Sequence, residues 1–278
     1  MLARNGGRRA DQTRDISVVY EHLDRVDGSA RFGFGETKSL ASISGPIEVR
    51  PTQENPSQAT LDIQIRPLAA LPGTDAKALA TTLKSIFAPS LFLSHHPRTL
   101  IQIVGQALCG SDSGSGLGSV GRGWNASLTA SLVNATAAAF INAGSVPMRG
   151  VVCAVAVGKL KGDADGELIL DPEEVELPRL AGSGCFAFLF SSSLSADAGA
   201  SSDIPPCSLL WTNYTTAAPF DVAELSRARE LAAKGARQVW FALKESLAPR
   251  GTSTPIDAKV KGERPSQDME VDDEKVEI

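Results

Sequence analysis

Aromatic side chains are scarce in this chain, since only 5% of its residues are Phe, Trp or Tyr. We therefore expect a core that is mainly aliphatic and rich in alanine. Hydrophobic residues still make up 42% of the sequence against 21% charged residues, a balance that supports a folded core and argues against wholesale disorder. The length of 278 residues suits one large domain or two small ones.

Basic residues are fewer than acidic ones, 27 against 32, so the formal net charge is −5 at pH 7. This argues against a protein that coats nucleic acid by bulk charge, so any RNA contact must use a local basic patch. One candidate is the stretch 113–162, which has no acidic residue but holds Arg122, Arg149, Lys159 and Lys161. These cations could steer RNA phosphates, or they could be dispersed charges that keep the surface soluble.

Cysteine and histidine are too few and too poorly spaced for an evident metal site. The four cysteines, at positions 109, 153, 185 and 207, show no CxxC spacing, which favours buried free thiols in a reducing compartment. His95 and His96 are adjacent and have no acidic neighbour, which favours surface or turn positions over metal ligands. The sequence therefore predicts neither a metal site nor a cofactor.

Long apolar runs are missing as well. The N-terminus carries Arg4, Arg8 and Arg9 without an apolar segment behind them, so it lacks the pattern of a secretory signal. No run approaches the roughly 18 apolar residues of a membrane span. We therefore expect no association with a membrane.

What the sequence does contain is a group of short alternating runs near its start. Two of them, at 30–34 and 40–43, flank a turn at 35–38, and Gly45-Pro46 is expected to end the second strand. A third run at 59–67 alternates apolar and polar residues in the same way. These runs predict a three-stranded antiparallel meander with one buried face.

The rest of the chain alternates helical and extended patterns. A helix is predicted from a cap at Thr74 or Asp75 to about Pro89, with apolar residues at helical spacing over 79–87. A second is predicted at 127–142 with Gly144 as its C-cap, and a third from Asp221, with Glu224 completing a capping box. Further strands are predicted at 100–104, at 151–157 as a central strand buried on both faces, and at 167–170, 185–190 and 207–212. This order indicates an α+β fold.

Composition also suggests the domain boundaries. We expect a flexible arm at 1–15, one folded domain at 16–248 with a Gly/Ser-rich loop inserted at 110–123, and a disordered acidic tail at 249–278. The inserted loop contains a literal GxGxxG at 116–121. No acidic residue follows about 20 positions later to bind a ribose, so the motif indicates a loop far more than a dinucleotide site.

Five strings in a fixed order carry a family resemblance. They are VDGSARF at 26–32, GETK at 35–38, SGPIEVR at 44–50, HPRT at 96–99 and VPMR at 146–149. The stretch from Ile16 to Leu247 resembles the RNase PH family, and the wording is most similar to the ring subunits of the eukaryotic RNA exosome. The resemblance implies an RNase PH-like α+β fold, with an antiparallel meander and a mixed sheet packed against helices.

The resemblance also implies partners and a location. Such subunits assemble with other RNase PH-like subunits into a six-membered ring, with cap subunits that carry RNA-binding domains and with associated catalytic nucleases. They thread single-stranded RNA through a central pore and work in the nucleus, nucleolus and cytoplasm. For RNA binding we select Arg98 and Arg149, within the matching strings, and Arg50 and Arg66, at strand ends. Each of these could instead pair with a carboxylate at a subunit interface.

No catalytic residue is predicted. Active members of the family grip phosphate with the hydroxyl and guanidinium of a Gly-Gly-Thr/Ser-Arg string, whose counterpart here is 125–128. Ser127 keeps the hydroxyl, but Leu128 replaces the arginine. The paired aspartates of active members correspond to Leu177 and Ser183, and the basic loop after the third strand is reduced to Lys77. We thus expect a structural, RNA-binding subunit that supports 3′–5′ RNA processing and degradation.

The alternative is an active phosphate-dependent 3′–5′ exoribonuclease of the RNase PH type. Acidic residues at Glu173, Glu174 and Glu176 could serve acid–base chemistry or bind a metal in that case. A solvated turn after Asp171 is the plainer interpretation of this cluster. A shift of one position in the comparison would place Glu176 where an active member has its first aspartate.

Overall fold

The structure, a computed structural model, describes residues 4, 7–68, 71–108, 125–161, 166–192, 204–217 and 219–247. All of them belong to one compact unit that ends at Leu247. The expected Gly/Ser-rich loop with its glycine motif and the expected acidic tail lie outside the described residues.

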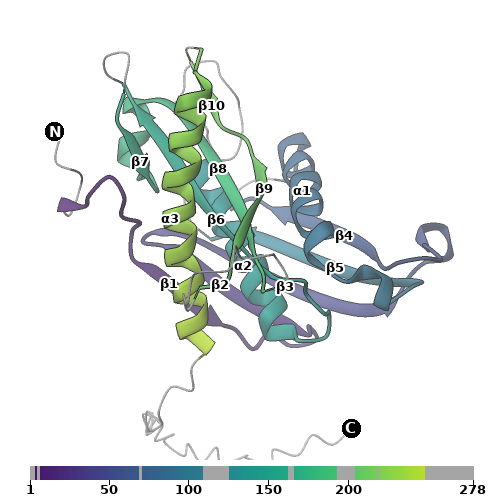
Figure 1. Cartoon of the computed structure of the whole chain (residues 1–278). Helices are drawn as coiled ribbons and strands as arrows, with labels where there is room; N and C mark the ends of the chain where they lie inside the picture. Colours follow the sequence, from purple (N-terminus) through teal and green to yellow (C-terminus); the bar gives the residue numbers. More distant parts are fainter. Residues whose placement is uncertain are drawn as a thin grey trace, which may run out of the picture. The chain divides into compact units, whose positions relative to one another are not determined.

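The first half of the chain forms a five-stranded sheet of order β1-β2-β3-β5-β4 (Figure 1). Its strands are β1 (Ile16–Tyr20), β2 (Gly28–Phe34), β3 (Thr37–Glu48), β4 (Thr60–Arg66) and β5 (Thr99–Ala107). The predicted β2–β3 hairpin is confirmed, with Ala30 opposite Ala41 and Phe34 opposite Thr37. Buried and half-buried residues alternate along β3 and β5, so one face of the sheet is covered, as the alternation predicts.

Two details of the predicted meander are wrong. The third run, β4, does not pair with β3, because β5 lies between them and pairs parallel with β4 and antiparallel with β3. The reason is the connection through a helix, which returns the chain parallel to β4. Nor does Gly45-Pro46 end β3, which continues to Glu48 past an irregularity between Ser44 and Ile47, while the Asp27 carboxylate accepts the Gly45 N–H.

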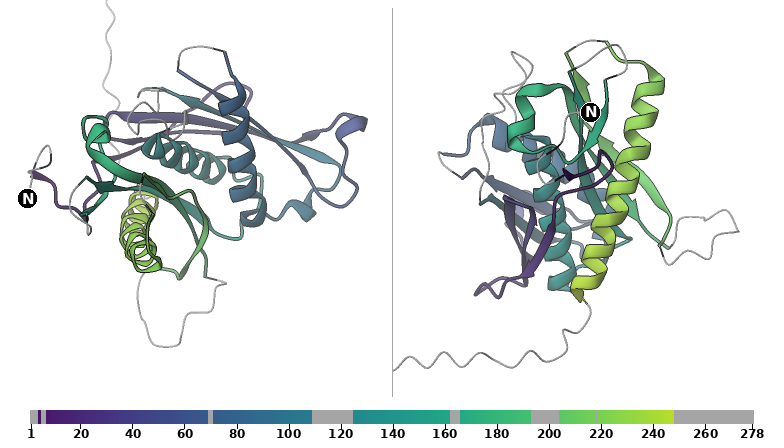
Figure 2. Two further views of the ribbon diagram at one scale, coloured as in Figure 1. Left: turned by 90° about the horizontal axis from the view of Figure 1, so that it is seen from above. Right: turned by 90° about the vertical axis from the view of Figure 1, so that its left-hand side faces the viewer.

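Helix α2 (Ala126–Ala143) lies between the two sheets and forms the centre of the core (Figure 2). Every residue from Ala126 to Phe140 is buried, which explains why its sequence is so rich in small side chains. The buried amide of Asn134 joins it to the second sheet by accepting from and donating to the Ala154 backbone, at 2.7 and 2.8 Å. Gly144 caps the helix with a positive φ, as predicted.

The second half of the chain forms another five-stranded sheet, in which β10, β8, β6 and β7 follow one another and β9 pairs with β8. Its strands are β6 (Val151–Leu160), β7 (Leu168–Leu170), β8 (Leu180–Phe190), β9 (Cys207–Thr212) and β10 (Thr215–Thr216). The predicted central strand is β6, which is buried from Val152 to Gly158. Cys153 and Cys185 are buried free thiols, as expected, whereas Cys207 is a free thiol that is only half-buried and Cys109 lies outside the described residues.

Two further helices complete the layers. Helix α1 (Thr74–Phe87) covers β4 on the same side as α2, with the rings of Phe87 and Phe140 5.6 Å apart. Helix α3 (Val222–Leu247) covers the outer face of the second sheet and reaches β1, where Ser246 bonds the Tyr20 hydroxyl (Figures 1 and 2). The molecule therefore stacks sheet, helix, sheet and helix.

The capping box predicted at the start of α3 is wrong in one member. Asp221 does accept the Val222 N–H at 2.7 Å. Glu224 instead turns into the protein, where it accepts from the Tyr214 hydroxyl at 2.7 Å and from Lys159 Nζ at 2.6 Å. A half-buried cation and a buried hydroxyl offer this carboxylate stronger partners than a helix end would. Burial, together with the hydrogen bond to Glu224, raises the pKa of Tyr214.

The prediction that no apolar run approaches the length of a membrane span is wrong for helix α2. By length and composition alone it is apolar enough to cross a membrane, but 83% of it is buried within the protein. That burial is typical of the core helix of a globular domain.

Candidate functional site at the start of helix α2

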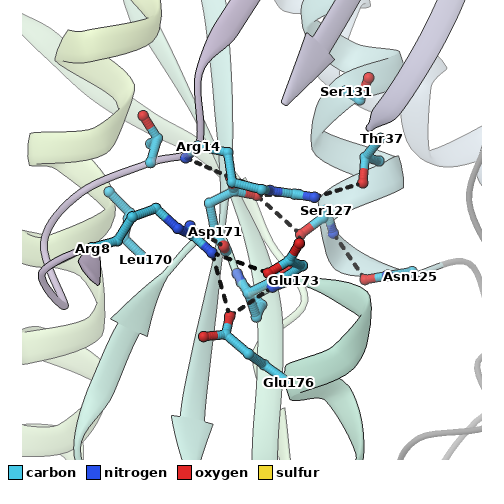
Figure 3. A network of polar contacts seen from close by, with 12 residues as sticks. Arg8, Arg14, Thr37, Asn125, Ser127, Ser131, Leu170, Asp171, Glu173 and Glu176 are labelled. Atoms are coloured by element: carbon cyan, nitrogen blue, oxygen red, sulfur yellow. Dashed lines mark hydrogen bonds and ion pairs between the residues drawn. The ribbon is translucent and has the colours of Figure 1, made fainter. Parts of the chain in front are cut away.

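Helix α2 begins beside the residues that end β7, and this meeting point is the best candidate for a functional site (Figure 3). Asn125 caps the helix by accepting the Ser127 N–H at 3.1 Å. The Ser127 hydroxyl is buried and lies 3.2 Å from Asp171 Oδ1 and 3.0 Å from the Pro172 carbonyl oxygen. The one hydroxyl that the family comparison selected is therefore held by internal acceptors.

Asp171 is the centre of this arrangement. It is fully buried, and its φ of +46° turns the chain sharply after β7. Arg14 donates to it from the backbone N–H at 3.0 Å, from Nε at 2.8 Å and from Nη2 at 2.7 Å, while Nη1 donates to Thr37 at 2.9 Å. Such a forked pair has the geometry that makes Arg–carboxylate contacts strong. Together Arg14 and Asp171 join the first strands to the second sheet.

The described residues of the expected flexible arm, 4 and 7–15, take part in the same network, so these residues contact the folded domain. Arg4 donates to Glu176 at 2.9 and 3.1 Å and to the carbonyl oxygen of Leu170 at 2.9 Å. Thr13 donates its hydroxyl to Gln238 of α3 at 2.9 Å. The charged side chains of this segment have partners far away in the sequence. Arg4 pairs with Glu176 and Arg14 with Asp171, each more than 150 positions away.

The acidic cluster after Asp171 is ordered into a 3-10 helix, η5 (Glu174–Arg179). Glu173 and Glu176 form a capping box, and the Glu173 N–H donates to Glu176 Oε2 at 2.8 Å. Glu176 thus belongs to an ion pair whose side chains are only 6% and 13% exposed, and the solvated turn is wrong for this residue. Glu174 does face the solvent.

The environment of Glu176 lowers the pKa of its carboxyl group. Burial by itself would raise this pKa, but hydrogen bonds from Arg4 and from the Glu173 N–H and the charges of Arg4 and Arg8 outweigh it. A carboxyl whose pKa is lower in the folded state stabilises the fold above its unfolded pKa. That stabilisation is lost as the pH falls through the folded pKa.

We therefore expect Glu176→Gln to cost about 1.5–3 kcal/mol of unfolding free energy at pH 7, where a charge-assisted hydrogen bond is lost. The penalty should shrink as the pH falls below about 4.5, where the carboxyl of the unfolded chain becomes protonated, and it should disappear once the pH has passed below the lower pKa of the folded state. Urea titrations between pH 3 and 7 measure this. Glu174→Gln, an exposed neighbour, is the matched control, and equal penalties at all pH values would contradict the ion-pair account.

The positions that matter for phosphorolysis in active family members hold other side chains here. Leu128 is buried in the core and is only 1% exposed, so it leaves no room for an anion at its position. Leu177 lies in η5, and Ser183 lies in β8 opposite Thr215. Lys77 is exposed on the first turn of α1. Among the described residues, no group of three or more His, Cys, Asp or Glu side chains could hold a metal.

A groove of about 540 Å³ lies between the end of β4 and the first turns of α1. Its polar lining includes Arg66, Lys77 and Gln106, beside apolar side chains such as Ile65 and Leu71. Gln106 is near the end of β5, and β5 ends where β3 begins, close to the Thr37 contact of Arg14. Arg66 therefore lies at the end of the molecule where α2 starts.

The other three arginines selected from sequence lie at the opposite end. Arg50 follows β3, and Arg98 precedes β5 and is joined to Glu54 at 3.3 Å. Arg149 follows α2, with its guanidinium 4.9 Å from the ring centre of Phe92. The four arginines do not form one site, and their role in RNA binding stays a prediction.

The fold and this end of α2 define an RNase PH-type domain. Residues 12–145 match the RNase PH family profile described as 3′ exoribonuclease family, domain 1. The chain belongs to the RNase PH family. The resemblance and the α+β fold class predicted from sequence are thereby confirmed.

Several relatives are named as exosome components. The chain is 32% identical over 178 residues to the exosome complex exonuclease RRP46 homolog of rice, covering 64% of this chain and 67% of the relative. It is 30% identical over 256 residues to exosome complex component Rrp41 of Archaeoglobus fulgidus, covering 89% and 87%. It is 30% identical over 156 residues to exosome complex component RRP46 of Saccharomyces cerevisiae, covering 56% and 65%.

Solved structures agree. The crystal structure of rice Rrp46 superposes with a TM-score of 0.69 at 25% identity, covering 87% of this chain and 99% of that one. An archaeal exosome core superposes with a TM-score of 0.63 at 14% identity, covering 87% and 91%, and this second likeness supports the fold alone.

Proposed function

We propose that this chain is a non-catalytic ring subunit of an RNA exosome core, which supports 3′–5′ RNA processing and degradation. Its similarity to relatives named as exosome components, over two thirds or more of the rice and Archaeoglobus proteins, supports the assembly. The observation that carries the non-catalytic part is the start of α2, where Ser127 and Asp171 bond to each other and Leu128 fills the place of a phosphate-binding arginine.

The partners follow from this role. The chain would close a six-membered ring with other RNase PH-like subunits, below cap subunits that carry RNA-binding domains and beside associated catalytic nucleases. Strands β1 and β4 are the two edges of the first sheet. The backbone groups of an edge strand can pair with another chain unless another segment covers them or charged side chains prevent the pairing, so a neighbouring subunit could cover these edges. Single-stranded RNA is the proposed ligand, and the nucleus, nucleolus and cytoplasm are the proposed locations.

A second candidate function is a phosphate-dependent 3′–5′ exoribonuclease. Two observations favour it: the rice relative is named an exonuclease, and Ser127 keeps the hydroxyl of the phosphate-binding string. It would need Ser127 to leave Asp171 and turn toward an anion, although the arginine that completes the clamp in active members is missing.

Assembly tests the proposed role. The full chain, co-expressed with the other RNase PH-like exosome subunits from the same organism, should elute with them as a hetero-oligomer, and light scattering should give the mass of a ring. Elution of this chain as a separate monomer beside a complete ring of the others would count against the proposal. A single-chain preparation alone serves as the reference.

A further inference from the structure

Three side chains at the end of the molecule opposite Ser127 form a stack. The Phe92 ring lies 5.2 Å from the His95 ring at an interplanar angle of 17°. The guanidinium carbon of Arg149 lies 4.9 Å from the centre of the same Phe92 ring. Phe92 and His95 follow helix α1, whereas Arg149 follows α2, so the stack joins two connections that are distant in sequence.

The backbone beneath the stack is fixed by a short antiparallel ladder. The Phe92 N–H donates to the Pro147 carbonyl at 3.0 Å, and the Arg149 N–H donates to the Ser90 carbonyl at 2.8 Å. Leu91 and Met148 form a bridge between these bonds, and Leu91 is buried. The backbone of Phe92 and Arg149 is therefore fixed, and the His95 N–H donates to the Phe92 carbonyl at 3.2 Å, so the backbone has little conformational entropy left to lose when a ligand contacts the stack.

The outer members of the stack are available to a ligand. His95 and Arg149 are exposed, whereas Phe92, whose ring both of them contact, is half-buried. An imidazole and a guanidinium are flat groups on which nucleic-acid bases stack. Planar groups of this kind, next to further cations, are typical of single-strand binding surfaces.

Further charge at this end comes from Arg50 and Arg98. Arg98 is 69% exposed, and its contact with Glu54 is a surface pair of little net strength that a phosphate could displace. A protein partner would favour an apolar centre in its contact surface. Among the described residues, the large apolar side chains exposed to solvent come from neither of the two segments, 88–98 and 144–151, that build the stack. Nucleic acid fits this surface better.

We propose that the stack of Phe92, His95 and Arg149 is a contact site for single-stranded RNA. Bases stack on the exposed faces of His95 and Arg149, while Arg98 contacts phosphate. This rests on the proposed function and adds to it a particular surface, separate from the start of α2. It also divides the selected arginines by role, since Arg149 acts on bases and Arg98 on the backbone.

The test compares variants by fluorescence anisotropy with labelled single-stranded RNA at several salt concentrations, using the full chain alone and in its ring. His95→Ala and Arg149→Lys each remove a stacking surface, and each should weaken binding about 10-fold, within the range of stacking on one side chain. Their salt slopes should stay near that of the unchanged protein. Arg98→Ala should reduce the salt slope by about 1. Arg237→Ala, an exposed cation on α3, is the control.

The stacking variants should also lose their preference for RNA over an abasic oligonucleotide of equal length. Binding of His95→Ala and Arg149→Lys equal to that of Arg237→Ala would overturn the proposal, as would no RNA binding by the unchanged chain. Weaker association with ring subunits, with RNA binding intact, would assign the stack to a protein partner instead. A chain that enters no ring but shows the stacking pattern would defeat the proposed function and leave this site standing.

Discussion

Asp171→Asn is expected to lower the unfolding free energy by about 3–5 kcal/mol, because it leaves the charge of Arg14 buried without its partner. The two side chains are 0% and 9% exposed, and three N–H groups of Arg14 donate to the Asp171 carboxylate. Water cannot replace the lost charge at such a site. In a domain of this size the loss corresponds to a fall in Tm of about 10 °C.

Urea unfolding followed by circular dichroism measures the effect. Asp62→Asn, at a half-buried position on β4 of the first sheet, is the matched control. The paired change of Asp171→Leu with Arg14→Leu should cost less than the two single changes added together, since neither charge is then left unpaired. A single-variant loss below about 1 kcal/mol would mean that water or other groups already solvate Arg14.

Local patterns predicted the elements of this fold well because each pattern reflects contacts near in sequence. The alternation from Ala30 to Phe34 specified the face that β2 buries, and the small residues of α2 indicated close packing. The pairing of β4 could not be obtained in this way. The same alternation suits an antiparallel or a parallel neighbour, and the choice was made by the helix α1 that returns the chain beside β4.

Only part of the candidate site could be predicted from the sequence, because its other contacts join residues that are distant along the chain. Ser127 came from a family comparison, and the structure then showed its hydroxyl bonded to Asp171. Arg14 and Asp171 are 157 positions apart, and a single sequence contains no signal that pairs them. The three arginines at positions 4, 8 and 14 were the available hint, because so much charge on a short segment calls for acidic partners. The segment 1–15 was predicted to be a flexible arm instead.

The isolated chain is expected to release no nucleoside diphosphate from single-stranded RNA in the presence of inorganic phosphate. Phosphorolysis needs cations and N–H donors that hold the attacking phosphate and an acid or metal at the leaving oxygen. At the start of α2 the Ser127 N–H is already bonded to Asn125, and Leu128 offers no charge. Leu177 and Ser183 supply no carboxylate where active family members have two.

The size of the expected deficit follows from how many groups are missing. Removal of one electrostatic donor costs about 10²–10³-fold in rate, and here an arginine and two carboxylates are replaced together. The rate should therefore lie far below that of an active RNase PH-type enzyme assayed in parallel. Thin-layer analysis separates nucleoside diphosphates, which depend on phosphate, from the monophosphates that a contaminating hydrolase would release.

If the assay detects residual release of nucleoside diphosphates, the variants Glu174→Ala and Ser127→Ala show whether this chain is its source. Glu174 is exposed and can be changed without disturbing the fold, whereas Glu176 cannot, because Arg4 would lose its partner. Phosphate-dependent diphosphate release that falls with either variant, in protein of unchanged Tm, would show that the chain itself performs the reaction. In that event Ser127 must exchange Asp171 for phosphate during turnover, and the exoribonuclease would replace the silent ring subunit. Absence of release from the unchanged chain, beside full activity of the parallel enzyme, is the result that the buried Ser127–Asp171 contact leads us to expect.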